Sequence, residues 1–186
     1  MGCSHERPLI VRGTLARLWA CRRGVNAVEF AIIAPFMLTL LLGTTELSNA
    51  MQAHRKVTAV TSSIGDLVAQ AKVIDNQDIA DVFSAGEAIM VPFDVTPLEM
   101  VISSVVADQN GQTKVAWSDG YRATPRTVDS SYALPEGLVT ANQSVIVAEV
   151  RYAYTSPLNK FIAGSMDMED TFFLKPRRTT QVVRQP

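Results

Sequence analysis

The side chains that most often carry out chemistry are scarce in this chain of 186 residues. It has two cysteines, Cys3 and Cys21, and two histidines, His5 and His54. A Cys/His metal cage needs more ligands than these separated residues supply. Because both cysteines lie within the first 21 residues, we expect neither thiol chemistry nor a disulfide in the body of the chain.

The sequence also lacks the short motifs that mark common enzymes. It contains no G-x-S-x-G, no P-loop, no H-E-x-x-H and no dinucleotide-binding fingerprint. His54 falls on the polar side of a predicted helix, where a surface histidine is expected rather than a general base. Asp75, Asp78 and Asp81 are three residues apart, whereas a calcium-binding EF-hand loop needs acids at alternate positions and a glycine at the sixth. We therefore expect no enzyme activity, no metal or other cofactor, and no small-molecule substrate.

Charge is distributed unevenly along the chain. The totals are 17 Lys plus Arg and 18 Asp plus Glu, and this balance argues against a nucleic-acid binder, which usually has a strong basic excess. Residues 1–24 hold five arginines and one acid, a net of +4, so residues 25–186 hold 12 bases and 17 acids, a net of −5. A basic head on an acidic body is a signal of membrane topology.

An apolar run follows the basic head. Residues 25–45, VNAVEFAIIAPFMLTLLLGTT, contain 14 apolar residues, and Glu29 is their only charge. A helix of this length rises roughly 31 Å, the thickness of a bilayer hydrocarbon core. The pattern predicts a transmembrane helix over 25–45, with the arginines of the leader on the cytoplasmic side and the body of the chain outside.

Two other interpretations of this run are a buried helix of a soluble domain and a cleaved secretory signal. The basic flank and the Leu40-Leu41-Leu42 triplet fit a bilayer better than a protein core. A cleaved signal would need a small-x-small site after the run, but Gly43-Thr44-Thr45-Glu46 and more helical sequence follow.

Two residues are unusual in such a helix. Glu29 costs several kcal/mol in lipid unless it is neutral, paired or close to the interface. Pro35 removes a backbone hydrogen bond and therefore predicts a helix kink.

The residues around Gly24 resemble a known processing site. In type IV pilin-like proteins a basic leader ends in glycine, and the prepilin peptidase leaves a new N-terminus with glutamate at its fifth position and an aromatic residue at its sixth. Counted from Val25, Glu29 is fifth and Phe30 is sixth. The string RRGVNAVEFAIIAPFMLTLLLGTTELSNA is similar to the TadE-like family of tight-adherence (Flp) pilus assembly proteins, whose pattern G-x-x-A-V-E-F-A-hydrophobic-x-x-P this chain follows through Pro35. Many members of the Flp group carry tyrosine where this chain has Phe30.

The resemblance implies a structural role in a bacterial pilus system. It implies a minor pilin (pseudopilin) made as a precursor with a leader over 1–24 and cut between Gly24 and Val25 by a prepilin peptidase. The mature chain would be a single-pass protein of the inner membrane, with its N-terminus cytoplasmic and its body periplasmic. Its partners would be other pilus assembly proteins and pilins, and it would enter the fibre, sit at its tip or act only at its base.

The resemblance also implies a role for Glu29 beside Phe30, which is to attract the new N-terminus of a neighbouring subunit during assembly. The alternative function is an uncleaved single-pass membrane protein whose periplasmic domain binds a ligand or another envelope protein. A generic anchor has no reason to keep the spacing between Gly24 and Glu29.

The body of the chain begins with two predicted helices. Apolar residues recur at spacings of three and four over 46–72, which predicts a continued helix with one apolar stripe: Ala50, Ala53, Val57, Val60, Ile64, Leu67 and Ala71. This stripe suits either the core of its own domain or a bundle with partner helices. A second helix is predicted over 76–90, starting at Asp75 and ending before Pro92. Its expected buried face is Ile79, Val82, Phe83, Gly86 and Met90.

Strand-like segments follow the helices. The predicted strands are 98–107, 113–118, 144–155 and an edge strand over 170–174. The Asn110-Gly111 pair favours a type I′ hairpin turn between the first two. The strand over 144–155 should direct Ile146, Ala148, Val150, Tyr152 and Tyr154 to the core.

The remaining segments are predicted to be loops and a tail. Residues 119–137 should form mostly loop, 158–163 a short turn or helix, and 176–186 a flexible polar tail. The whole is an α+β fold: a long N-terminal transmembrane helix that continues into a domain over 46–175 with a second helix and a small antiparallel sheet. The resemblance implies that this domain is pilin-like.

Overall fold

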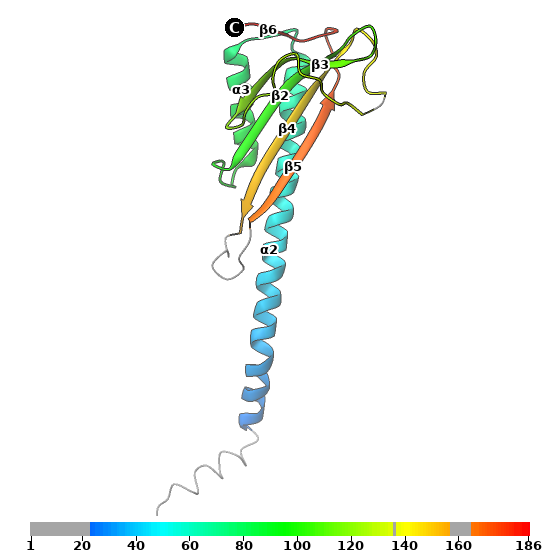
Figure 1. Ribbon diagram of the computed structural model, residues 1–186. Helices are drawn as coiled ribbons and strands as arrows, with labels where there is room; N and C mark the ends of the chain where they lie inside the picture. Colours follow the sequence, from blue (N-terminus) through cyan, green and yellow to red (C-terminus); the bar gives the residue numbers. More distant parts are fainter. Residues whose placement is uncertain (1–22, 136, 157–164) are drawn as a thin grey trace, which may run out of the picture. The chain divides into compact units, whose positions relative to one another are not determined.

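Two helices, with a two-residue strand between them, precede the four-stranded sheet of this chain, whose computed structural model describes residues 23–135, 137–156 and 165–186 (Figure 1). Helix α2 spans Arg23–Gln70 and helix α3 spans Asn76–Met90. The strands are β1 (Val73–Ile74), β2 (Leu98–Ala107), β3 (Thr113–Tyr121), β4 (Ser144–Thr155), β5 (Ser165–Leu174) and β6 (Val183–Arg184). The predicted α+β architecture, with a long N-terminal apolar helix, a second helix and an antiparallel sheet, is confirmed. The chain divides into two compact units, residues 1–47 and residues 48–186.

The main sheet has four antiparallel strands in the order β3-β2-β4-β5. The bounds of β2 and β4 are those predicted from the sequence. Strand β3 is longer than predicted because it stays paired with β2 as far as Tyr121, which lies opposite Met100. Strand β5 starts at Ser165 because it pairs with β4 as far as Thr155. The turn or helix predicted over 158–163 lies outside the described residues.

The hairpin between β2 and β3 is present, but its predicted turn type is wrong. A type I′ turn needs positive φ at both central residues, whereas within the fully described loop 108–112 only Gly111 has one, at 78°. The Asp108 carboxylate accepts hydrogen bonds from the backbone N–H groups of Asn110 and Gln112, at 2.8 Å each. This side chain stabilises a type I turn that closes with a left-handed glycine.

One face of the sheet packs against α3 and the second half of α2. Four residues of the predicted stripe, Ala53, Val57, Val60 and Ile64, are almost completely buried. Leu67 does not follow the prediction, because it is 45% exposed while Val68 is fully buried in its place. The buried face of α2 shifts around the helix axis at this point, because other segments of the chain cover a different side of the helix. A Cβ on Gly65 would lie 2.6 Å from Leu174 Cδ1, and the Arg177 N–H donates to the Ala69 carbonyl oxygen.

Helix α3 buries the face that the sequence predicts, including Ile79, Phe83 and Met90. Its first turn is closed by a capping box, in which the Asp75 carboxylate accepts from the Asp78 N–H at 2.9 Å and the Asp78 carboxylate accepts from the Asp75 N–H at 3.0 Å.

Gly86 allows α3 to approach the sheet and α2 closely. A Cβ on Gly86 would lie 2.7 Å from Met100 Sδ and 3.3 Å from both Ile64 Cγ2 and Val60 Cγ1. The glycine that weakens the helix in isolation is therefore the contact point of three elements.

The opposite face of the sheet carries a second, smaller core that sequence analysis missed. Val105, Val115, Val145 and Val147 are buried there. Tyr132, Leu134 and Val139 from the long connection between β3 and β4 pack over them, together with Phe173. The continuous apolar run Val145–Ala148, which does not alternate, was the available signal.

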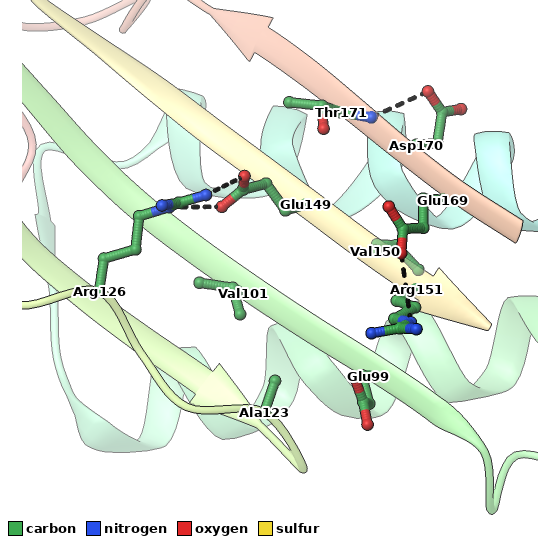
Figure 2. A pocket seen from close by; sticks show the side chains of 10 residues that line it. All are labelled: Glu99, Val101, Ala123, Arg126, Glu149, Val150, Arg151, Glu169, Asp170 and Thr171. Carbon is green, nitrogen blue, oxygen red and sulfur yellow. Dashed lines mark hydrogen bonds and ion pairs between the residues drawn. The ribbon is translucent and has the colours of Figure 1, made fainter. Parts of the chain in front are cut away.

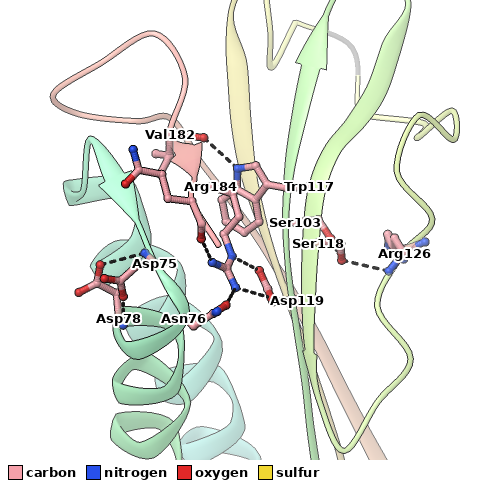
Figure 3. Close-up of polar contacts among 11 residues, drawn as sticks. Asp75, Asn76, Asp78, Ser103, Trp117, Ser118, Asp119, Arg126, Val182 and Arg184 are labelled. Carbon is pink, nitrogen blue, oxygen red and sulfur yellow. Dashed lines mark hydrogen bonds and ion pairs between the residues drawn. The ribbon is translucent and has the colours of Figure 1, made fainter.

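The last residues of the chain are placed differently from the flexible tail predicted over 176–186. Val182 is fully buried, and β6 pairs in parallel with β1 through Val73↔Val183 and Ile74↔Arg184. The Trp117 indole N–H donates to the Val182 carbonyl oxygen at 2.8 Å (Figure 3). The segment is polar on average, but one apolar side chain and one arginine dock it against the domain.

Candidate functional site

The predicted processing residues lie at the start of α2. The helix begins at Arg23, so Gly24 and Val25 are in its first turn. Val25 and Glu29 are four residues apart and therefore share one face of the helix. Glu29 is exposed, and the ring of Phe30 is 71% exposed. The basic leader before Arg23 lies outside the described residues.

Helix α2 continues without a break through Pro35. The kink predicted at this proline stays a prediction. The hydroxyls of three threonines in this half donate to backbone carbonyl oxygens of the preceding turn: Thr39 to Pro35 at 2.8 Å, Thr44 to Leu41 at 3.0 Å and Thr45 to Leu42 at 2.9 Å. Internal pairing of this kind lets a hydroxyl enter an apolar medium without an unsatisfied donor.

The apolar side chains of this half are exposed all around the helix. Most are about half exposed or more, namely Val28, Phe30, Ile32, Ile33, Phe36, Met37, Leu38, Leu40, Leu41, Leu42 and Leu47. The most apolar 18-residue window of α2 has a mean hydropathy of 1.9 and contains no buried residue. Among the described residues, α2 is the one helix that is both long enough and apolar enough to cross a membrane. A core helix is covered by protein, so this exposure favours the transmembrane interpretation over a buried core helix.

The outer face of the sheet holds a second candidate, a polar groove with a cavity of about 220 Å³ (Figure 2). Arg126 pairs with Glu149 through two contacts, Nε–Oε2 at 2.8 Å and Nη2–Oε1 at 2.5 Å. The Arg126 guanidinium also lies 4.7 Å from the centre of the Tyr132 ring. Arg151, on the same strand as Glu149, contacts Glu169 at 3.2 Å and Asp167 at 3.3 Å across β5.

These pairs determine the electrostatics of the groove. The hydrogen bond to Glu149 raises the pKa of Arg126, although partial burial opposes this shift. Burial, followed by the negative charge of Glu149, raises the pKa of Tyr132 above its usual value. The groove therefore presents guanidinium–carboxylate pairs, and the neutral phenol of Tyr132 lies beside one of them. Within the described lining, no nucleophile lies beside a base. The charged residues on the outward positions of β4 were the sequence signal for this face.

A third polar cluster docks the end of the chain (Figure 3). The Arg184 guanidinium contacts both carboxylate oxygens of Asp119, at 2.8 Å and 3.1 Å, and the side-chain oxygen of Asn76 at 2.5 Å. The bond to Asp119 raises the pKa of Arg184. The cluster ties β6 to β3 and to the start of α3, so its arrangement is structural.

Three remaining candidates from the sequence are placed as follows. His54 is exposed on α2. Asp75 and Asp78 cap α3. Within residues 23–135, 137–156 and 165–186, no group of three or more His, Cys, Asp or Glu side chains is placed to hold a metal ion.

Comparison with protein families matches part of the chain. The family model described as TadE-like protein matches residues 24–64, which confirms over this segment the resemblance seen in the sequence. The matched range begins at Gly24 and covers the apolar half of α2 and much of the buried half. Searches of curated proteins and of solved structures found no match to this chain.

Proposed function

We propose that this chain is the precursor of a minor pilin (pseudopilin) that takes part in assembling a tight-adherence pilus. In this proposal a prepilin peptidase cuts the bond between Gly24 and Val25, and the apolar half of α2 then holds the mature chain in the inner membrane. The domain over 48–186 faces the periplasm and meets other pilus components. The match of residues 24–64 to the TadE-like family supports involvement in pilus assembly.

One observation carries the proposal, which is the division of α2. The helix starts at the residues that resemble the processing site, exposes apolar side chains over 26–47, and then supplies fully buried residues such as Val60 and Ile64 to the domain core. A subunit that is held in a bilayer before assembly needs a helix of this kind. Exposed apolar area of this extent is costly in water and is satisfied by lipid or by other apolar helices.

Glu29 is the residue to which we assign a specific role in assembly. Cleavage would create a positive α-amino group at Val25, one helical turn from the Glu29 carboxylate. Opposite charges that are partly removed from water attract each other far more strongly than in bulk water. The same pair formed between neighbouring subunits would bring an incoming subunit into register.

The processing step is tested by N-terminal sequencing of the membrane-bound protein. We expect the mature chain to begin at Val25, and we expect Gly24→Leu to leave the precursor uncut because a small residue is needed at the scissile bond. Gly43→Leu is a matched control on the same helix, since a Cβ added at Gly43 meets no atom within 4 Å. A mature chain that begins at Met1 in cells with the peptidase would refute the processing step.

The role of Glu29 is tested by Glu29→Gln, which keeps the shape of the side chain and removes its charge. We expect normal insertion and cleavage, with loss of piliation and of co-purification with other pilus components. Glu46→Gln is the control on the same helix, about 25 Å farther along. A strain that carries this variant should form pili normally. Normal piliation of the Glu29→Gln strain contradicts the role.

The orientation is tested with protease added to intact spheroplasts. The arginine excess before residue 25 predicts digestion of the body and survival of the anchor. A body that resists digestion until the membrane is opened contradicts the orientation.

The alternative function is an uncleaved membrane protein with a periplasmic binding domain. The groove on the sheet, with its Arg126–Glu149 pair, is the observation that favours it. An intact N-terminus together with normal piliation in a deletion strain would select this alternative.

A further inference from the structure

The polar groove on the outer face of the main sheet lies beside the part of that face that the connection between β3 and β4 covers. The connection packs over the small valine core, with Tyr132 and Leu134 among its contacts. Next to that core, β2, β4 and β5 line the groove, and Arg126 from the connection forms one of its margins (Figure 2). The groove is therefore an unpartnered region of an otherwise covered sheet.

The groove has more negative than positive groups. Its lining holds four carboxylates and two guanidinium groups, a net charge of −2: Glu99, Glu149, Glu169, Asp170, Arg126 and Arg151. Both arginines are already occupied, since Arg126 pairs with Glu149 and Arg151 contacts two carboxylates of β5. Glu99 lies opposite Arg151 in the sheet but forms no ion pair with any described residue. The charge that the groove offers to a partner is therefore negative.

A surface of opposite charge follows β5 in the same compact unit. Lys175, Arg177 and Arg178 are all exposed, and we call these three residues the basic end. The segment crosses the end of α2, where the Arg177 N–H donates to the Ala69 carbonyl oxygen at 2.8 Å and the Arg177 guanidinium contacts Asp66 at 2.5 Å. Lys175 and Arg178 have no ion pair within the part of the chain that the structure describes. Two cations of the basic end are therefore available to a partner.

The groove and the basic end lie on different sides of the domain. The groove is on the outer face of the sheet, whereas the basic end is held against α2, which packs on the other face. Two copies that met groove to groove, or basic end to basic end, would bring like charges together. A groove that meets the basic end of another copy brings opposite charges together. Such a contact is heterologous, and it leaves one groove and one basic end free to continue a row of copies.

We propose that the groove of one copy of this chain receives the basic end of a second copy, with Lys175 and Arg178 meeting Glu99 and Glu169. The proposal rests on the proposed function, because anchoring in one membrane is what brings the copies together. One groove and one short segment bury less than the roughly 1,000 Å² of a stable interface. The contact is therefore weak between dilute chains, and salt should weaken it further because its charges are exposed.

The contact is tested by zero-length cross-linking of the full-length chain in phosphatidylcholine vesicles. A carbodiimide joins a carboxylate to a lysine amine that touches it, and an amide forms with net loss of water. Equal amounts of isotope-labelled and unlabelled protein are combined, so that a cross-linked peptide pair of mixed labelling comes from two different copies. Lys114 is the matched control, because it is an exposed lysine of the same unit on β3.

We expect mixed cross-links from Lys175 to Glu99 or Glu169. At 0.1 M salt they should be about fivefold more abundant than those from Lys114, and they should be lost at 1 M salt, where the screening length is about 3 Å. Equal yields from the two lysines, or cross-links from Lys175 within one copy only, overturn the proposed contact. A chain that does not float with the vesicles overturns the anchor of the proposed function and this contact with it.

Charge reversal tests the same contact from both sides. The pair Glu99→Lys and Glu169→Lys should abolish the mixed cross-links, and so should the pair Lys175→Glu and Arg178→Glu. All four substitutions together should restore them, with the lysines and the carboxylates exchanged between the two surfaces. Circular dichroism verifies that each variant is folded. A folded fourfold variant without mixed cross-links contradicts the contact, whereas the cut after Gly24 and the role of Glu29 would be unaffected.

Discussion

The two halves of α2 are built from similar apolar residues, but their surroundings differ. In residues 26–47 the exposed fractions of Phe30, Ile33 and Leu41 are 71%, 50% and 58%. In residues 48–70 the exposed fractions of Val57, Val60 and Ile64 are 1% or less. The first half is apolar on all sides, and the second carries polar residues between the members of its stripe. The difference indicates that one helix can suit two surroundings, because only the second half has a periodic apolar stripe that defines a covered side.

The comparison is tested most severely by truncating one isoleucine in each half. Ile64 is fully buried against α3 and the sheet, so Ile64→Ala should lower the free energy of unfolding of the domain by about 2–5 kcal/mol. Ile33→Ala should leave it unchanged, because Ile33 is 50% exposed. Urea unfolding in detergent, followed by Trp117 fluorescence in a Trp19→Phe background, measures both. Equal effects would mean that the two halves do not differ.

A charge placed in each half provides the reverse test. Leu41→Arg should disfavour membrane insertion by up to about 3 kcal/mol, because it places a charge inside the apolar span, between its centre and its outer end. Leu67→Arg, on the exposed side of the buried half, should remain in the membrane fraction like the wild type. Alkaline carbonate extraction separates inserted from soluble protein. Retention of the Leu41→Arg variant at the wild-type level contradicts the assignment of the span.

A third variant tests whether the docking of β6 stabilises the domain over 48–186, which contains the buried half of α2. Arg184→Ala removes the paired contacts to Asp119 and the contact to Asn76, which should cost about 2 kcal/mol for partly buried charged hydrogen bonds. The Trp117 emission should shift, because its indole N–H donates to Val182 next to β6. Membrane insertion should not change. An unchanged emission spectrum would show that the segment stays docked without Arg184.

The smallest effects are expected from the two glycines of α2. Gly43→Ala should change the free energy of unfolding by less than about 0.5 kcal/mol, since no atom lies within 4 Å of the added Cβ. Gly65→Ala should lower it, because the added Cβ would lie 2.6 Å from Leu174 Cδ1 and 3.2 Å from Ala148 Cβ. Thermal unfolding of the two variants side by side decides the point, and a stabilised Gly65→Ala protein would contradict it.

Local patterns predicted a large part of this fold. The capped helix over 76–90 and the alternating strand over 144–155 were predicted with correct bounds, because the signals for both lie within the segments themselves. The exposure of Leu67 and the docking of Val182 were not predicted. Both depend on segments 65 or more residues away in the chain, and periodicity contains no information about them.

The candidate sites divide in the same way. The apolar span and the resemblance to a family over 24–64 could be predicted, because both are patterns of contiguous residues. The Arg126–Glu149 pair was missed because it joins a loop to a strand 23 residues later, and the spacing is set by the folded sheet. The cut after Gly24 and the pairing of Glu29 stay predictions.

The pairing of β6 with β1 also determines when the domain can be completed. Val73 lies opposite Val183, and the Arg177 N–H closes the end of α2 at Ala69. A ribosome that adds roughly 5–20 residues per second needs about 5–20 s to travel from β1 to β6. Throughout that interval the nascent chain has a core without its last buried residue and a tryptophan without its acceptor. The domain therefore matures only after β6 has been synthesised, and the unfinished chain is the form that chaperones and proteases encounter.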